Sequence, residues 1–264
     1  HRGPDEEGYY SDEKGLFFGM RRLSIIDLKH GSQPINTNKS VLIFNGEIFN
    51  YIELKKKYLA NRKDLNSDTK VLSYLYDKKG LSILKELNGF FSIAIFDKNK
   101  KKLYLIRDRY GIKPLYYNIS NNKIYFCSEI DPIRKIFNLN KDDLNLKQVN
   151  NFFTLGYING GERVYSKIKM LSPGNILEFD IRKKQTKFLK WFDIKNVGNI
   201  LFKNKKKLFE KLNEKIDNAV NLWTRSDVDK VFSLSGGLDS STLASVYANQ
   251  GNKVNTVSFV YKNL

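Results

Sequence analysis

The chain contains 264 residues, of which 41% are hydrophobic and 13% aromatic, and its 46 Lys and Arg residues outnumber its 28 Asp and Glu residues to give a net charge of +18. This composition excludes a collagen-like fibre, a coiled-coil rod and a disordered tail. The sequence contains no run of about 18 apolar residues, so it predicts no membrane-spanning helix. The single cysteine, Cys127, excludes a disulfide framework and suits a reducing compartment, so we expect a cytoplasmic protein.

The positive charge is spread along the chain. Local lysine runs lie at residues 98–102 and 203–207. The first run separates two apolar segments and predicts a hairpin tip, and the second precedes a helical pattern. A nucleic-acid interface concentrates its charge on one face, so these scattered lysines favour a solvated surface. We therefore expect neither nucleic acid nor a membrane as a partner.

The first 195 residues predict a mixture of helices and strands. Short apolar strands are expected at 15–23 and 41–45, followed by a helix over 47–58 and a second helix that Ser67 and Asp68 would cap. Further strands are expected in series at 90–97, 102–107, 114–118, 123–127, 176–181 and 186–192. Consecutive strands with the helices grouped elsewhere predict an α+β domain with an antiparallel sheet.

The pattern changes near residue 195. A polar segment at 196–204 precedes a helical stripe that ends at Val220. A strand at 231–234, a helix at 240–249 and a strand at 254–259 then follow without a hairpin between them. Such a βαβ unit is typical of a parallel sheet. The sequence thus predicts two domains, at 1–195 and 196–264.

The strongest chemical motif is the run Ser235-Gly236-Gly237-Leu238-Asp239-Ser240-Ser241, which follows an apolar strand and opens a helix. Glycines let backbone N–H groups approach an anion, and the helix N-terminus and serine hydroxyls add further donors. Asp239 suits this cradle if Mg²⁺ bridges it to the phosphates. A plain Ser/Gly turn with an Asp cap is the alternative. The coincidence of the glycine pair, the aspartate and the strand–turn–helix context favours phosphate binding.

A further set of motifs lies upstream of this run: Arg2-Gly3-Pro4-Asp5, Arg22-Leu23-Ser24-Ile25-Ile26-Asp27, Asn45-Gly46-Glu47-Ile48-Phe49-Asn50, Ser67-Asp68-Thr69, Leu87-Asn88-Gly89-Phe90-Phe91 and the stretch from Arg107 to Leu115. These upstream motifs resemble the class II glutamine amidotransferase domain, and the run from Ser235 resembles the SGGxDS loop of the N-type ATP pyrophosphatases. In this order, the motifs resemble those of the glutamine-hydrolysing asparagine synthetases. The resemblance implies an N-terminal-nucleophile-hydrolase-like αββα sandwich followed by the start of an adenine nucleotide α-hydrolase-like parallel sheet.

The residue types in these motifs suit glutamine. Arg22 offers a two-donor fork for the α-carboxylate, and Glu47 and Asp68 can take the α-ammonium. Asn45 and Gly46 can supply a side-chain amide and a backbone N–H as an oxyanion hole. Each alone has a structural explanation, as an ion pair, a helix cap or a turn, but together and in family order they favour a binding pocket. The resemblance adds Leu23, Ser24, Ile25 and Ile26 as glutamine-contacting residues.

The catalytic nucleophile is expected to lie outside residues 1–264. The family uses an N-terminal cysteine, which lies upstream of the Arg-Gly-Pro-Asp stretch with which this sequence begins. The sequence therefore reads as a chain cut at both ends, and no catalytic residue is expected within it. Cys127 is interpreted as a core residue.

The resemblance also implies the ATP site. Three departures from the family pattern stand out: Met20 replaces a histidine, Asp229 replaces a residue of a Pro- and Gly-containing approach to the ATP loop, and Val260 replaces a glycine. Asp239 is expected to hold Mg²⁺ through pyrophosphate. The expected ATP-binding residues are Ser233, Leu234, Ser235, Gly236, Gly237, Asp239, Ser240, Ser241 and Phe259.

The implied activity is the ATP- and Mg²⁺-dependent amidation of aspartate through a β-aspartyl-adenylate, with ammonia from glutamine, in a homodimer. One alternative is a related amidotransferase-linked ligase for another carboxylate. A second is a non-catalytic protein that keeps the fold. A tRNA-modifying pyrophosphatase is a weaker alternative, because the amidotransferase half speaks against it.

Overall fold

The computed structural model describes residues 1–12, 15–29, 31–158, 160–196, 198 and 204–260. The chain forms two compact units. The first comprises His1–Leu23 and His30–Val197, and the second comprises Ser24–Lys29 and Gly198–Leu264. No helix in the described ranges is long and apolar enough to cross a membrane.

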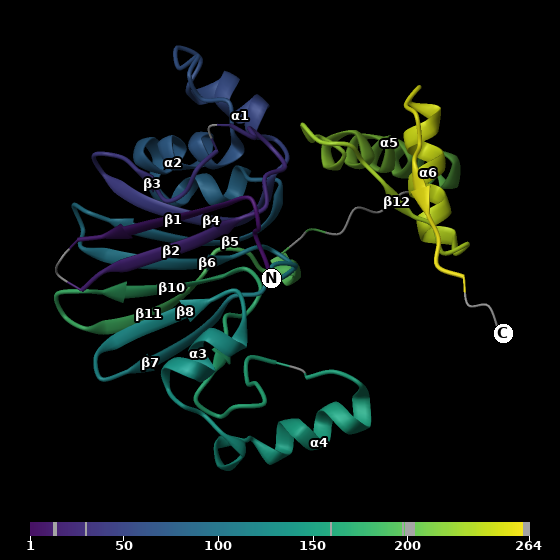
Figure 1. Ribbon diagram of the computed structural model, residues 1–264. Helices are drawn as coiled ribbons and strands as arrows, with labels where there is room; N and C mark the ends of the chain where they lie inside the picture. Colours follow the sequence, from purple (N-terminus) through teal and green to yellow (C-terminus); the bar gives the residue numbers. More distant parts are fainter. Residues whose placement is uncertain (13–14, 30, 159, 197, 199–203, 261–264) are drawn as a thin grey trace. The chain divides into compact units, whose positions relative to one another are not determined.

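A six-stranded sheet forms the centre of the first unit (Figure 1), and its neighbouring strands are all antiparallel. Helices α1 (Tyr51–Tyr58) and α2 (Asp68–Lys79) and the 3₁₀-helix Gly80–Glu86 pack on one face of this sheet. The strand order is β11 (Gln185–Lys190), β10 (Asn175–Asp180), β6 (Lys102–Arg107), β5 (Gly89–Asp97), β4 (Ser40–Ile48) and β3 (Ile35–Asn36).

Successive side chains of a strand point to opposite faces of the sheet, so the central strands contribute residues to two hydrophobic cores. On β5, Ile93 and Ile95 join the core under the helices, whereas Ala94 and Phe96 join a core on the opposite face. A strand with apolar residues on both faces must lie between two layers. The second core is closed by a second sheet, so β5 lies in the interior of the unit.

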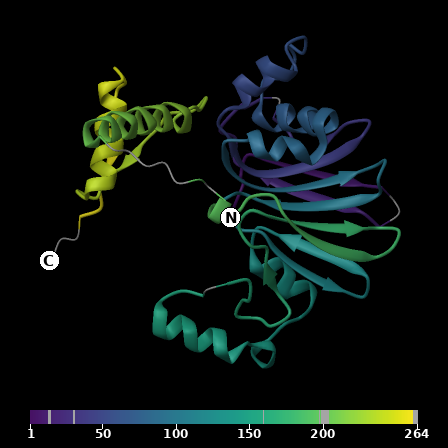
Figure 2. The ribbon, with the colours of Figure 1, turned by 180° about the vertical axis from the view of Figure 1, so that it is seen from behind.

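The second sheet has the order β8 (Lys123–Cys127), β7 (Tyr116–Ser120), β9 (Lys169–Met170), and a separate hairpin pairs β1 (Glu6–Ser11) with β2 (Phe17–Arg22). Phe18 of β2 and Tyr117 of β7 both pack in the core between the sheets. Helix α3 (Ile130–Ile136) covers the outer face of the second sheet through Ile133, as Figure 2 shows from behind. The order helix, sheet, sheet, helix confirms the expected αββα sandwich.

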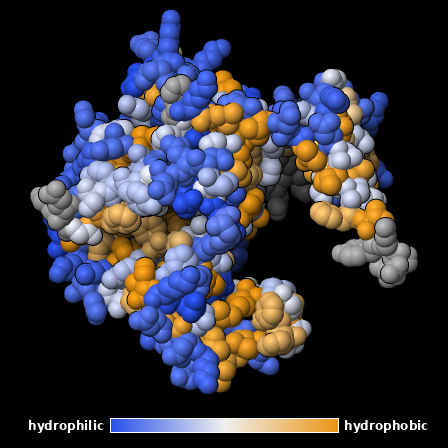
Figure 3. Space-filling view, in the orientation of Figure 1, coloured by the Kyte–Doolittle hydropathy of each residue, from blue (hydrophilic) through white to orange (hydrophobic). Residues whose placement is uncertain are grey.

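Helix α4 (Leu146–Leu155) follows α3 and leaves much of its apolar surface exposed. Phe153 is 82% exposed, and Leu146, Phe152 and Leu155 are also exposed. Figure 3 shows hydrophobic side chains gathered over this helix.

The second unit is a βαβ structure preceded by a long helix. Strands β12 (Phe232–Ser233) and β13 (Thr256–Val257) pair in parallel, and helix α6 (Leu238–Asn249) connects them. Helix α5 (Lys205–Trp223) begins after Asn204, whose side chain accepts hydrogen bonds from the first turn. This arrangement confirms the parallel strand–helix–strand unit expected from the sequence.

The segment Ser24–Lys29 belongs to this second unit by its contacts. Asp227 N–H donates to Ile25 O at 3.0 Å, and Asp27 N–H donates to Asp227 Oδ2 at 2.8 Å. One residue thus holds the segment through two reciprocal hydrogen bonds.

The expected start of the first helix is wrong. The helix expected from residue 47 begins at Tyr51, because β4 continues to Ile48 and pairs there with Gly89 of β5. Pairing with β5 extends through Asn45, Gly46 and Glu47 to Ile48, and it outweighs the helical spacing of apolar residues. The cap expected at Ser67 is confirmed, since its hydroxyl accepts from Lys70 N–H at 3.2 Å.

Candidate functional site

Three of the residues predicted to bind glutamine lie consecutively at the end of β4. Asn45, Gly46 and Glu47 pair with the start of β5. Gly46 has a φ of 149°, and a Cβ at this position would lie 2.0 Å from Phe90 O. Only glycine fits such a close approach of two strands. The strand therefore presents an amide, a bare backbone and a carboxylate side by side.

Asp68 joins this strand end to helix α2. It is the first residue of α2 and only 5% exposed. Its Oδ2 accepts from Ile48 N–H at 3.1 Å, and its Oδ1 accepts from Thr69 N–H at 2.7 Å. The predicted carboxylates Glu47 and Asp68 are therefore brought together by adjacent backbone.

The surroundings of the two carboxyl groups disfavour their ionisation. Burial, then the nearby charge of Asp68, raises the pKa of Glu47 above its ordinary value, and Lys113 and Arg22 oppose this rise. Burial also raises the pKa of Asp68, although its backbone hydrogen bonds and the charge of Arg22 act in the opposite direction. We call Arg22, Glu47, Asp68 and Lys113 the Glu47 cluster. Without a ligand, this cluster favours keeping a proton on its carboxyl groups.

Arg22 ends strand β2 and contributes the cation of the cluster. Its side chain is only 8% exposed, and its Nη1 donates to Glu6 Oε2 at 3.1 Å. A buried guanidinium beside two buried carboxyl groups is an arrangement of opposite charges suited to a zwitterion. The structure thus brings together Arg22, Asn45, Gly46, Glu47 and Asp68, and their binding of glutamine stays a prediction.

One buried polar atom of this region lacks a partner among the residues that the structure describes. Glu47 Oε2 is buried without a hydrogen bond, and the half-buried Asn45 lies two residues before Glu47 in β4. Buried polar atoms are normally satisfied, so this atom at the end of β4 indicates a place for a polar ligand. An amide beside a backbone N–H can donate to a developing oxyanion.

The remaining residues predicted to bind glutamine are not part of the Glu47 cluster. Leu23 is 60% exposed at the end of the first unit's opening segment, whereas Ser24, Ile25 and Ile26 belong to the second unit. Ile26 is buried there, at 6% exposed. Their contact with glutamine therefore stays a prediction.

The predicted phosphate loop has the expected local geometry. Gly236 has a φ of 79°, in the left-handed region that favours glycine, and Gly237 is the N-terminal cap of α6. Ser235 Oγ lies 3.1 Å from Ser240 Oγ and accepts from Gly237 N–H at 3.3 Å. These hydrogen bonds shape the turn.

The loop leaves donors available at its helix end. Within the described part of the chain, the backbone N–H groups of Leu238, Asp239 and Ser240 make no hydrogen bond, and Asp239 is exposed. Unpaired N–H groups at a helix N-terminus favour an anion. Asp239 can accept a cation that accompanies such an anion, but the described residues contain no cluster of three metal-ligating side chains.

The other residues predicted to bind ATP lie in or next to β12, β13 and α6. Ser233 pairs with Val257, Leu234 N–H donates to Val257 O at 2.9 Å, and Ser258 Oγ donates to Leu234 O at 2.7 Å. Ser241 follows in α6, and Phe259, just beyond β13, is 85% exposed. An exposed aromatic ring at a strand end can stack on a base, but nothing in the structure tests that role for Phe259.

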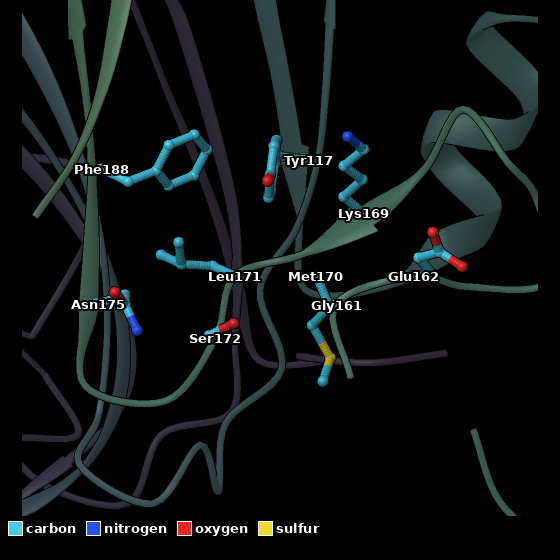
Figure 4. Close-up of a pocket in the computed structure, with 9 residues that line it drawn as sticks. All are labelled: Tyr117, Gly161, Glu162, Lys169, Met170, Leu171, Ser172, Asn175 and Phe188. Atoms are coloured by element: carbon cyan, nitrogen blue, oxygen red, sulfur yellow. The ribbon is translucent and has the colours of Figure 1, made fainter. Parts of the chain in front are cut away.

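A separate cavity of about 400 Å³ opens elsewhere in the first unit (Figure 4). No predicted glutamine- or ATP-binding residue lines it. The rings of Tyr117 and Phe188 lie 6.2 Å apart in its wall. Its lining residues are Tyr117, Gly161, Glu162, Lys169, Met170, Leu171, Ser172, Asn175 and Phe188.

Sequence reasoning gave no role to three residues around the Glu47 cluster. Glu6 binds Arg22, and Lys113 acts on Glu47 through its charge. Asp108, which is 1% exposed, accepts from four backbone N–H groups. Lys113 and Asp108 were visible within a quoted motif, but Glu6 becomes meaningful only through strand pairing.

Cys127 lies at the end of β8, is not disulfide-bonded and packs against the core between α3 and the second sheet. This position agrees with its interpretation as a core residue.

Comparisons with known proteins agree with both halves of the chain. Residues 1–192 match the glutamine amidotransferase domain family, and residues 211–263 match the asparagine synthase family. Asparagine synthetase [glutamine-hydrolyzing] 1 of Bacillus subtilis is 36% identical over 93% of this chain and 39% of its own length. Asparagine synthetase [glutamine-hydrolyzing] 2 of the same organism is 33% identical over 92% of this chain and 34% of its own length.

The chain thus spans about half or less of the length of the curated relatives it matches. The family match over residues 1–192 covers the αββα unit and every residue of the Glu47 cluster. On this evidence, the chain belongs to the glutamine amidotransferase domain family.

Proposed function

We propose that the Glu47 cluster binds glutamine and that this chain is part of a glutamine-hydrolysing asparagine synthetase. The observation that carries the proposal is a buried arginine near two carboxyl groups of raised pKa, those of the buried Asp68 and of Glu47, whose Oε2 is buried without a partner among the described residues. This charge arrangement complements an amino acid that carries both an α-carboxylate and an α-ammonium.

Each polar group then has one role in glutamine hydrolysis. Arg22 holds the α-carboxylate, and Glu47 and Asp68 hold the α-ammonium, which favours ionisation of both carboxyl groups. The Asn45 amide and the Gly46 N–H stabilise the oxyanion that forms when a thiolate attacks the side-chain amide. The family's N-terminal cysteine would supply that thiolate, and ammonia is released.

The second unit is proposed to bind ATP for activation of aspartate. Residues 1–195 would form the amidotransferase domain, and residues 196–264 would contribute to the ATP-pyrophosphatase domain. The N–H groups of residues 238–240 and the hydroxyls of Ser235, Ser240 and Ser241 would hold the phosphates. Asp239 would hold Mg²⁺ through pyrophosphate, and Mg²⁺ would neutralise the charge that develops there.

The complete reaction follows from the two sites. The aspartate β-carboxylate attacks ATP to give β-aspartyl-adenylate and pyrophosphate, and ammonia then displaces AMP to give asparagine. A homodimer in the cytoplasm is proposed as the working form, with aspartate as the acceptor.

The test is glutamine binding to matched arginine variants. Arg22→Ala should abolish binding of L-glutamine in titration calorimetry, whereas Arg21→Ala, on the exposed face of the same strand, should leave it unchanged. Equal affinities for the two variants would contradict the proposed site.

A further inference from the structure

The β1–β2 hairpin carries two ion pairs of the same composition on opposite faces. Glu6 lies opposite Arg22 in the strand register, and Glu7 lies opposite Arg21. The Glu6–Arg22 distance is 3.1 Å and the Glu7–Arg21 distance is 2.9 Å. The side chain of Arg22 is 8% exposed, but that of Arg21 is 57% exposed. Only the Glu6–Arg22 pair includes a residue of the Glu47 cluster. The Glu7–Arg21 pair therefore serves as a matched control.

The backbone that carries Glu6 is fixed on both sides. Asp5 N–H donates to Arg22 O at 3.1 Å. A Cβ on Gly8 would lie 1.8 Å from Gln33 O, so this strand approaches residue 33 more closely than any residue but glycine allows. Gln33 Oε1 in turn accepts from Phe44 N–H at 2.7 Å, directly before Asn45. Glu6 is therefore held in a defined position relative to the end of β4.

Glu6 is also held in its charged form. Hydrogen bonding from Ser32, followed by the hydrogen bond and charge of Arg22, lowers the pKa of Glu6, although its partial burial acts in the opposite direction. A charged acceptor on Nη1 restrains a planar guanidinium more strongly than a neutral one, because charge-assisted hydrogen bonds are shorter and stronger.

We propose that Glu6 is a positioning residue for substrate carboxylate recognition: it holds the guanidinium of Arg22 in the orientation that receives the α-carboxylate of glutamine. The inference rests on the proposed function of the Glu47 cluster. Glu6 itself touches no substrate. It acts through Arg22, and its effect is confined to ligands that carry an α-carboxylate.

The test compares two ligands on four proteins. Affinity for L-glutamine and for 4-aminobutanamide, which is glutamine without its α-carboxylate, would be measured for the unmodified chain, Glu6→Ala, Glu6→Gln and Glu7→Ala. Glu6→Ala should weaken L-glutamine binding about tenfold, the size expected for one charge-assisted hydrogen bond. Its affinity for 4-aminobutanamide should stay unchanged, Glu6→Gln should restore part of the L-glutamine affinity, and Glu7→Ala should match the unmodified chain.

The opposite results overturn the inference. If Glu6 competed with the substrate for Arg22, Glu6→Ala would bind L-glutamine more tightly. If Glu6 served only the fold, both ligands would weaken together, and so would the isosteric Glu6→Gln. Unchanged L-glutamine affinity in Glu6→Ala would also exclude a positioning role.

The two single variants separate this inference from the proposed function. If Arg22→Ala abolishes L-glutamine binding but Glu6→Ala does not alter it, only the role of Glu6 fails. If Arg22→Ala leaves binding intact, the glutamine site itself is wrong.

Discussion

Glu47 and Asp68 lie together where neither ionises easily. Burial raises the pKa of both, the charge of Asp68 raises that of Glu47 further, and Glu47 Oε2 has no hydrogen-bond partner among the described residues. Ligand-free protein therefore carries an unfavourable interaction that an ammonium group would relieve. Binding sites commonly sacrifice stability in this way.

Replacing Glu47 by a neutral residue should therefore raise the stability of the fold but weaken the binding of L-glutamine. Glu47→Gln removes a carboxyl group that must take up a proton on folding at neutral pH. Its melting temperature should therefore rise at neutral pH, by about 2–4 °C for each kcal/mol gained in a chain of this size. The same variant should lose L-glutamine binding, because one ligand of the ammonium is neutral. Thermal unfolding and calorimetry on one preparation measure both effects.

Glu86 is the matched control for this variant. Its carboxylate is hydrogen-bonded by Lys79, Tyr58 and Lys57, which lower its pKa to about 2. Glu86→Gln should therefore lower the melting temperature without changing glutamine affinity. A fall in melting temperature for Glu47→Gln would show that the charge at residue 47 stabilises the fold.

The raised pKa values also predict the pH dependence of glutamine binding. The ammonium needs ionised carboxylates, so affinity should fall as pH falls, and the fall should begin well above the ordinary carboxyl pKa of about 4. The stability of the ligand-free chain should have the opposite sign, decreasing as pH rises through the same range, because the folded state holds protons more tightly than the unfolded state.

Calorimetry with L-glutamine between about pH 5 and pH 9 measures this dependence against the ordinary carboxyl range. An affinity that is constant down to about pH 5 would contradict the assignment of the ammonium to Glu47 and Asp68.

At the scale of elements, the turn from β6 to β7 depends on one carboxylate. Asp108 Oδ1 accepts from Tyr110 and Ile112 N–H at 2.9 and 3.0 Å, and Oδ2 accepts from Lys113 and Phe91 N–H at 3.0 and 3.2 Å. This residue therefore ties the turn carrying Lys113 to the start of β5, which pairs with Gly46 and Glu47.

Asp108→Asn should be strongly destabilising for its size. The new amide N–H₂ must face two backbone N–H donors, and one buried mismatch of this kind costs about 1–3 kcal/mol. Chemical denaturation would measure the loss in free energy of unfolding. Asp180→Asn is the control, because Asp180 lies in a more exposed turn and uses only Oδ1, for Arg182 and Lys183 N–H. Equal losses in the two variants would show that the four-donor arrangement has no special weight.

The sequence predicted the elements whose side-chain pattern matches their burial. β5 alternates between two cores, and α2 has a recognisable cap at Ser67. It did not predict the full length of β4, because Glu47 and Ile48 also fit a helical spacing and only pairing with Gly89 and Phe90 decides between them. Helix α4 was not predicted, although Leu146, Val149 and Phe153 recur at helical spacing.

The site was predictable in the same uneven way. Arg22, Asn45, Gly46, Glu47 and Asp68 stand in motifs with a family precedent, and the structure brings them together. The partnership of Glu6 with Arg22 depends on hairpin register across 16 residues, which no local pattern reveals. Long-range pairing is information that a single sequence does not display.

At the scale of the molecule, the two units should respond to different ligands. L-glutamine should slow amide hydrogen exchange at residues 45–48 and 67–69, whereas ATP with Mg²⁺ should slow it at 235–241, because ligand binding stabilises the segments it contacts. Omitting Mg²⁺, or introducing Asp239→Asn, should weaken only the second effect. Protection of residues 235–241 by glutamine alone would contradict separate sites.

The route of the chain affects any attempt to dissect the molecule. A cut at residue 197 follows the sequence, yet the contacts of Ser24–Lys29 lie with the residues beyond it. The excised amino-terminal fragment would retain a six-residue loop stripped of the Asp227 carboxylate that accepts its Asp27 N–H. The excised carboxy-terminal fragment would lose the Ile25 carbonyl that accepts from Asp227 N–H. The boundary between the two units in space thus differs from any single cut in the sequence. Strand β2, which ends at Arg22, leads directly into Ser24–Lys29, the segment that such a cut would separate from its contacts.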